Sequence, residues 1–308
     1  MRDKFDRRAF RESGWRRRTP RFGQPALNIA FSPPIPPSGW SNSFSTFFNG
    51  LDELLSGSVP MTGSQAETGL PIGATGSFAW SLWIYGSGTA PSSWLGGSGN
   101  ETLFTIGNQG AGVGSRFLQQ SFKTRDSVPG TFEWTFYETS PDGTSTTARF
   151  SAPDVFVWNH IILSLNGAGA TNADKIRIYI NGAEQSPTFV GTLPGALLTS
   201  SLPLVLASAG TSRFGAFAID ELCLYNTNLT QSHATALYNG GTPVDPTSIT
   251  GSSNLAHYWR FGDETDADPT IYDRTILAGI TPINFTMINM DASNITASVA
   301  PAGTISWP

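Results

Sequence analysis

The residues best suited to chemistry in this chain of 308 residues are carboxylates, since pairs of carboxyl groups cleave glycosidic bonds. A retaining glycosidase needs two such groups about 5 Å apart, usually on one face of one strand. Asp220 and Glu221 are adjacent, so a regular strand points them to opposite faces. Glu133 has no second acid on its predicted strand, and no Glu-x-Asp-x-x-Glu run occurs. The sequence therefore predicts that this protein is not an enzyme.

Histidines and a second group of acids are weaker candidates for catalysis or metal binding. His160 follows Trp158 in a predicted strand, where a structural hydrogen bond is the expected role. His233 and His257 stand alone, without the spacing of metal ligands. The second group of acids comprises Asp263, Glu264, Asp266 and Asp268. Their loop lacks the glycine and terminal glutamate of an EF-hand, which favours a solvated acidic turn. No cofactor is expected, and Ca²⁺ stays an open alternative.

Two tryptophans outside the predicted strands are candidates for binding a glycan through an exposed ring. Trp94 lies in a loop rich in Gly and Ser, residues 86–100, and is the preferred candidate; Trp40 is the second. The chain has nine tryptophans, and most of them are expected in the core.

The first 21 residues form a basic arm. They hold nine Lys and Arg against three acids, a net charge of +6, whereas the remaining residues hold nine against 20, a net charge of −11. Phe5, Phe10 and Trp15 recur every five residues, which fits neither a helix nor a strand, so the arm cannot fold alone.

Three interpretations of this arm compete: a solvated tail, a segment that binds nucleic acid, and an arm that orders against an acidic protein surface. The third is favoured, and nucleic acid is the less favoured partner. The residues expected to anchor the arm are Arg7, Arg8, Arg11, Trp15, Arg16, Arg17, Arg18 and Arg21.

The elements that must position these residues are strands and one short helix. Residues 77–85 alternate large apolar residues (Phe78, Trp80, Leu82, Ile84) with a second set. In residues 217–225 both odd and even positions carry apolar residues, which indicates a strand buried on most of both faces. Thr230 then predicts the N-cap of a helix that Asn239 and two glycines end.

Several segments together resemble the laminin-G-like, concanavalin A-like jelly-roll family. In chain order they are the aromatic strand before the Asn49-Gly50 turn, the tryptophan strand 77–85, the Trp-x-His strand 158–165, the strand 175–182 with its Asn-Gly hairpin, and the closing segment 214–238. The resemblance spans residues 42–241 and implies an all-β jelly-roll β-sandwich with an extended N-terminal arm and a short β-rich C-terminal extension.

The domain limits follow from this resemblance. Residues 1–41 are predicted to be the basic arm and a proline-rich linker, residues 42–241 the jelly-roll domain, and residues 242–308 a linker and C-terminal β extension. The extension begins a new strand at Leu255, and roughly 50 residues are too few for another jelly roll. We expect it to pack on the first domain or on a neighbouring subunit.

These features lead to a functional hypothesis. The chain shows neither a signal peptide nor an apolar run long enough to cross a bilayer, so no membrane partner is expected. A jelly roll with a trailing Trp-Arg-Phe-Gly segment, residues 259–262, resembles those of phage virion proteins, which implies a structural protein of a virion, assembled in the host cytoplasm. It would serve in capsid decoration, a fibre or a tail, with neighbouring virion proteins and further copies of itself as partners. The alternative is a carbohydrate-binding module for host-surface glycans.

Overall fold

The computed structural model describes residues 40–86, 102–106, 120–124, 131–137, 145–197, 202–208, 214–275 and 277–297. All of them belong to one compact unit, Ile35–Pro308, and the other unit, Met1–Pro34, lies outside the described residues. The eight anchoring residues predicted in the arm and the glycan candidate Trp94 also lie outside the described residues. Their roles stay predictions.

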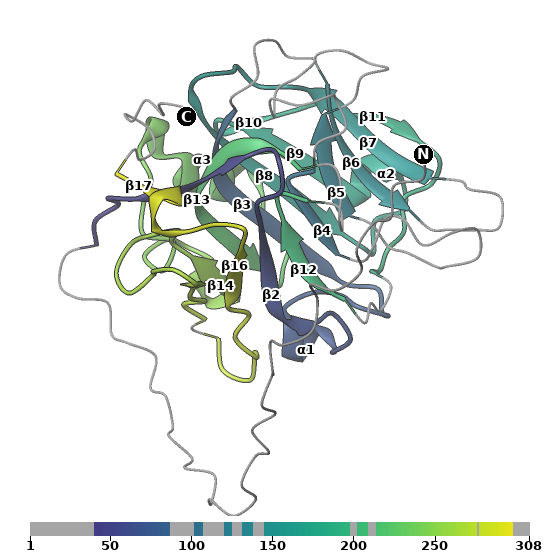
Figure 1. The fold of residues 1–308 in the computed structure, drawn as a ribbon. Helices are drawn as coiled ribbons and strands as arrows, with labels where there is room; N and C mark the ends of the chain where they lie inside the picture. Colours follow the sequence, from purple (N-terminus) through teal and green to yellow (C-terminus); the bar gives the residue numbers. More distant parts are fainter. Residues whose placement is uncertain are drawn as a thin grey trace, which may run out of the picture. The chain divides into compact units, whose positions relative to one another are not determined.

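One layer of the fold is an eight-stranded antiparallel sheet, called here sheet A (Figure 1). Its strand order is β10-β9-β8-β3-β13-β1-β17, and β14 also pairs with β13. Its strands are β1 (Ser45–Asn49), β3 (Ser77–Gly86), β8 (Trp158–Asn166), β9 (Ile176–Ile180), β10 (Ala183–Glu184), β13 (Ala216–Tyr225), β14 (Leu255–Trp259) and β17 (Ile295–Thr296).

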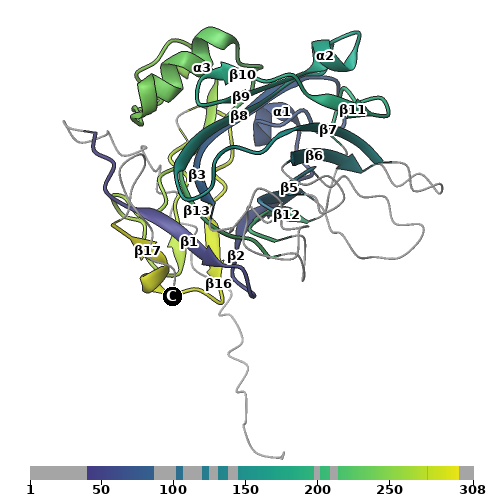
Figure 2. The same cartoon turned by 90° about the horizontal axis from the view of Figure 1, so that it is seen from above.

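Two smaller sheets form the other layer (Figure 2). The order of one is β15-β16-β2-β12-β4, and that of the other is β11-β7-β6-β5. Their strands are β2 (Leu54–Pro60), β4 (Phe104–Ile106), β5 (Gln120–Thr124), β6 (Thr131–Tyr137), β7 (Ser145–Ser151), β11 (Thr188–Val190), β12 (Pro203–Leu206), β15 (Thr270–Ile271) and β16 (Phe285–Ile288). The described helices are α1 (Gln65–Thr68), α2 (Asn172–Lys175), α3 (Gln231–Tyr238) and the 3₁₀ turns η2 (Asn239–Gly241), η3 (Ser252–Asn254) and η4 (Ala292–Asn294).

The hydrophobic core lies between the two layers. Trp80 and Leu82 of β3 pack in one cluster with Phe104 and Leu206 of the opposite layer, and all four side chains are fully buried. Because side chains alternate across a strand, this inward set leaves Ser81 and Trp83 on the outer face of sheet A. The expected all-β sandwich is confirmed.

A β-bulge divides β13 into two halves. Its register against β3 shifts between Asp220 and Cys223, and Glu221 has a positive φ of 49°. Phe217 belongs to the core cluster before the bulge, and Leu222 belongs to it after the bulge. The bulge therefore inserts one residue and reverses the alternation. This explains why both odd and even positions of the strand are apolar.

The prediction that Asp220 and Glu221 point to opposite faces is wrong. Asp220 shares the outward parity of Ala218, and Glu221 hydrogen-bonds to Tyr258, which packs in the outer-face cluster. The bulge is the physical reason, since it lets two consecutive residues lie on the same side of the sheet. Both carboxylates thus lie on the outer face of sheet A.

Residues after 242 contribute strands to both layers. β14 pairs with the second half of β13, β17 pairs with β1, and β16 pairs with β2. The new strand expected at Leu255 is therefore present and hydrogen-bonds to the strands of residues 45–225. The domain limits at residues 41 and 241 stay predictions.

Helix α3 covers one part of the outer face of sheet A (Figure 2). Thr230 has the extended backbone of an N-cap, and Asn239 ends the helix in the left-handed conformation, as the sequence predicts. Leu229, Ala234 and Leu237 pack with outward residues of the sheet. The remaining part of this face carries the candidate site.

Candidate functional site at the root of the N-terminal arm

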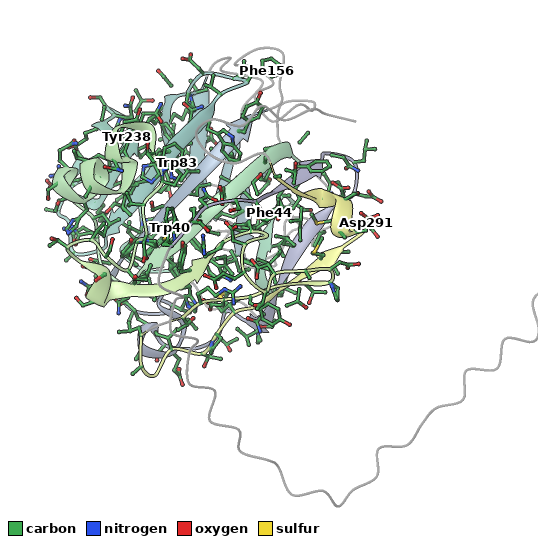
Figure 3. All side chains as sticks on the ribbon, turned by 90° about the vertical axis from the view of Figure 1, so that its left-hand side faces the viewer. Trp40, Phe44, Trp83, Phe156, Tyr238 and Asp291 are labelled. Atoms are coloured by element: carbon green, nitrogen blue, oxygen red, sulfur yellow. The ribbon has the colours of Figure 1, made fainter. Side chains whose placement is uncertain are left out.

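The first described residues, 40–43, run across the outer face of sheet A; we call them the root segment. Trp40 begins it and lies on the face that also carries Trp83 and Tyr238 (Figure 3). Its indole Nε1 donates a hydrogen bond of 3.1 Å to the hydroxyl of Tyr258 on β14. The Arg260 guanidinium lies over the indole ring, 5.3 Å from its centroid. Trp40 is therefore held by two contacts and is only partly exposed.

The rest of the root segment is held by carboxylates and by Arg260. Asn42 Nδ2 donates to Asp220 Oδ2 at 2.8 Å, and the Ser43 backbone N–H donates to both carboxylate oxygens of Asp263, at 3.0 and 3.1 Å. Arg260 donates from Nη2 to the backbone carbonyl of Ser41. Side chains from β13, β14 and the following loop thus converge on the four residues of the root segment. We call this set of side chains (Asp220, Glu221, Tyr258, Arg260 and Asp263) the clasp.

Arg260 is the centre of the clasp. Its guanidinium lies 3.4 Å from Glu221 Oε1, 3.3 Å from Asp263 Oδ2 and 2.7 Å from Glu264 Oε1. The side chains of Arg260 and Glu221 are each 4% exposed. Removal of Arg260 would leave Glu221 and Asp263 buried without a cation, which costs far more than an exposed ion pair contributes.

Burial governs the protonation of this cluster. It raises the pKa of Glu221 to about 8, against the opposing effects of the Arg260 charge and the hydrogen bond that Tyr258 donates to Glu221 Oε2. Burial likewise raises the pKa of Asp263, and it raises that of Asp266 to about 6. A buried carboxylate with several hydrogen-bond donors is a structural group, and it offers little access to a substrate.

A second arginine orders the loop that follows Arg260. Arg274 Nη2 donates to Asp266 Oδ1 at 3.0 Å, and its Nη1 donates to the Thr265 hydroxyl at 3.0 Å. The Tyr272 backbone N–H also donates to Asp266 Oδ1, at 2.8 Å. The loop therefore has a fixed shape although much of it is exposed.

The structure distributes the predicted acids between two roles. Asp263, Glu264 and Asp266 pair with Arg260 or Arg274, so they are not a simple solvated turn, while Asp268 is exposed. Within the described ranges, no three His, Cys, Asp or Glu side chains are arranged to hold a metal ion.

The other candidates lie apart from the clasp. His160 Nε2 shares a 2.9 Å hydrogen bond with Ser81 Oγ, the structural role expected of it. His257 Nδ1 lies 2.5 Å from Asp273 Oδ2, and Glu133 pairs with Arg149 at 2.9 Å. Each of these groups has a structural partner on a neighbouring element.

Sequence reasoning missed Arg260 and Tyr258. The available signal was an arginine directly after an apolar strand, in the run His257-Tyr258-Trp259-Arg260-Phe261. A buried arginine requires an acidic partner, and the partner Glu221 lies 39 residues away in sequence. That pairing depends on β13 and β14 being neighbours.

Comparison with known proteins identifies the superfamily to which this chain belongs. A family model described as laminin-G-like, of the concanavalin A-like lectin/glucanases superfamily, matches residues 62–235. The chain therefore belongs to the concanavalin A-like superfamily, as the resemblance implied. Comparison with curated proteins found no match.

The solved structures that match this chain include three of different kinds. A candidate carbohydrate-binding protein from Bacteroides ovatus is 17% identical, with a TM-score of 0.49 over 87% of this chain and 63% of the other. The binding domain of botulinum neurotoxin DC in complex with SialylT is 14% identical (TM-score 0.36, 54% and 35% covered). Trypanosoma rangeli sialidase is 15% identical (TM-score 0.35, 53% and 22% covered). This chain thus spans less than two thirds of each of these proteins.

None of the described helices is long and apolar enough to span a lipid bilayer.

Proposed function

We propose that this protein is a non-enzymatic structural component of a virion, in which the basic arm anchors an outward-facing β-sandwich to the particle. The observation that carries the proposal is the clasp. It fixes residues 40–43 to the sandwich through Trp40, Asn42 and Ser43. A force on the preceding residues is therefore transmitted to the folded sheet. An anchoring arm needs such a fixed root, whereas a solvated tail does not.

The non-enzymatic part of the proposal is supported by the state of the carboxylates. Asp220 and Glu221 share a face, but Asp220 is fully buried and Glu221 is 5% exposed. Asn42 of the root segment donates a hydrogen bond to Asp220, and Arg260 donates one to Glu221. This arrangement supports a role in holding the chain.

Deletion of residues 1–37 tests the anchor. The shortened protein keeps the root segment and should stay folded and soluble, but it should no longer join the particle in an assembly assay. Normal incorporation of the shortened protein would show that the arm is not the anchor. A matched variant, Arg16→Lys with Arg17→Lys and Arg18→Lys, keeps the charge of the arm but not the planar guanidinium groups, and it should lose less incorporation than the deletion does.

A second candidate function is adhesion to host-surface glycans. Membership of a superfamily that includes lectins favours it. A glycan array probed with the full-length protein discriminates the two, because a purely structural protein should show no preference for any sugar. If one sugar class is bound, Trp94→Ala should abolish the signal, as the sequence predicts for that loop.

A further inference from the structure

The loop after Arg260 presents a surface beside the root segment. Within residues 260–274, Asp268 and Glu264 are exposed, and Tyr272 is 41% exposed. Arg274 and Asp266 fix this surface from beneath, since they hold the backbone and side chains of the loop. It is thus a rigid surface that combines carboxylates with an aromatic ring.

The same loop holds more carboxylates than arginines. Residues 260–274 contain five acids and two arginines, and Arg260 is shared among Glu221, Asp263 and Glu264. Burial is the main reason that the pKa values of Asp263 and Asp266 are raised, and the negative charge of Glu264 raises both further. An additional cation at this surface would relieve that repulsion.

The root segment shows what kind of ligand this loop accepts. Asp263 receives a backbone N–H, and Arg260 packs on an indole ring. Arg274 likewise lies over the Tyr272 ring, 5.8 Å from its centroid. Peptide segments rich in arginine and aromatic residues fit such a surface, because guanidinium groups pair with carboxylates and stack on rings.

We propose that the surface formed by Glu264, Asp268 and Tyr272 binds the basic arm, residues 1–21, of a second copy of this chain. The inference rests on the proposed anchoring function and names one partner for the arm. Charge complementarity supports it, since the arm carries +6 and the rest of the chain −11. The same negative body disfavours a nucleic acid as the partner, because phosphates would approach an acidic surface.

Sedimentation velocity of the full-length protein, freed of nucleic acid, tests the proposal in low salt. The wild type should self-associate, and raising the salt to about 0.5 M should dissociate it, because screening weakens the charge pairs. Asp268→Lys with Tyr272→Ala leaves the clasp intact and should weaken association by about tenfold or more. The matched control, Asp52→Lys with Leu51→Ala, changes an exposed acid and an exposed apolar residue elsewhere and should associate like the wild type.

Mixing two variants that do not self-associate separates this contact from nonspecific association. Arg7→Glu with Arg8→Glu and Arg11→Glu should also abolish self-association. A mixture of that protein with the Asp268→Lys, Tyr272→Ala protein should form a complex, since the first contributes an unchanged surface and the second an unchanged arm. A monomeric wild type, or an unchanged association of the Asp268→Lys, Tyr272→Ala protein, would overturn the proposal.

The outcomes also distinguish the inference from the function on which it rests. If the protein without residues 1–37 fails to join the particle but the wild type is monomeric, the arm is an anchor for another partner. If wild-type association persists after the arm is deleted, the interface lies elsewhere. If the arm binds a DNA duplex with steep salt dependence and no self-association occurs, nucleic acid is the partner.

Discussion

The outer face of sheet A is covered in two different ways. Over β8, β9 and the end of β13, α3 and the preceding residue Leu229 bury apolar side chains such as Ile162 and Tyr179. Around the bulge of β13, the root segment is instead held by hydrogen bonds and ion pairs to the clasp. One cover depends on area removed from water, and the other on charge and protonation.

One sheet can therefore hold two segments whose attachment depends differently on salt and pH. The apolar cover should respond weakly to salt, whereas the clasp should respond to both salt and pH. The following experiments compare the two covers, from the largest expected effect to the smallest.

Arg260→Met should cause the largest loss. It leaves Glu221 and Asp263 buried without their cation, which should lower the free energy of unfolding by about 3–5 kcal/mol. The folded-state pKa of Glu221 is raised to about 8, so Glu221 is neutral at low pH and becomes a buried anion as the pH rises through 8. The stability due to its neutral form is then lost. Urea unfolding should therefore show a greater loss at pH 9 than at pH 6. Equal losses at both would show that Glu221 does not titrate there.

His160 should make the α3 side of the sheet sensitive to acid. Burial lowers its pKa from 6.5 to about 3, so the stability due to the neutral ring is present above pH 6.5 and is lost as pH falls toward 3. The loss should reach about 3 kcal/mol between pH 6.5 and 4. His160→Gln, which can still hydrogen-bond to Ser81, should unfold with a shallower dependence on acid in urea titrations. An unchanged acid profile would contradict this.

Leu229→Ala tests the apolar cover. Leu229 is fully buried in the cluster that includes Ala234 and Leu237, so its truncation should cost about 2–3 kcal/mol. The loss should be the same at 0.05 and 0.5 M NaCl when chemical unfolding is measured, because no charge is removed. A salt-dependent loss would mean that the two covers are coupled.

Trp40→Phe should have the smallest effect. The ring beneath Arg260 is kept, but the hydrogen bond from Nε1 to the Tyr258 hydroxyl is lost, which should cost about 1 kcal/mol. Proteolysis near residue 40 should accelerate while the thermal midpoint of the sandwich falls only slightly. If cleavage and midpoint both match the wild type, Trp40 does not secure the root segment.

Local patterns predicted much of the fold. The alternation of residues 77–85 defines β3, the Thr230 cap and the Asn239 ending define α3, and the apolar run from Phe217 to Tyr225 defines β13. The resemblance to the laminin-G-like family is confirmed by the family model. These features could be predicted because each is encoded within about ten neighbouring residues.

The candidate site could not be predicted in the same way. Arg260 was visible only as a polar residue after a strand, and its partner Glu221 becomes available only because the bulge turns it outward. Asp263 and Asn42 are brought to the same place by the pairing of β14 with β13 and of β1 with β13. A pattern of two-residue period carries no information about which strands become neighbours.

The sequence by itself determined the class of fold, the charge contrast between arm and body, and the positions of the main strands. Tertiary structure alone decided that Asp220 and Glu221 share a face, that residues after 242 complete both layers, and that residues 40–43 are held by Arg260 and its carboxylates. The physical reason is range: alternation and capping are contacts between near neighbours, whereas register, bulges and buried ion pairs depend on strands that meet only in the folded chain.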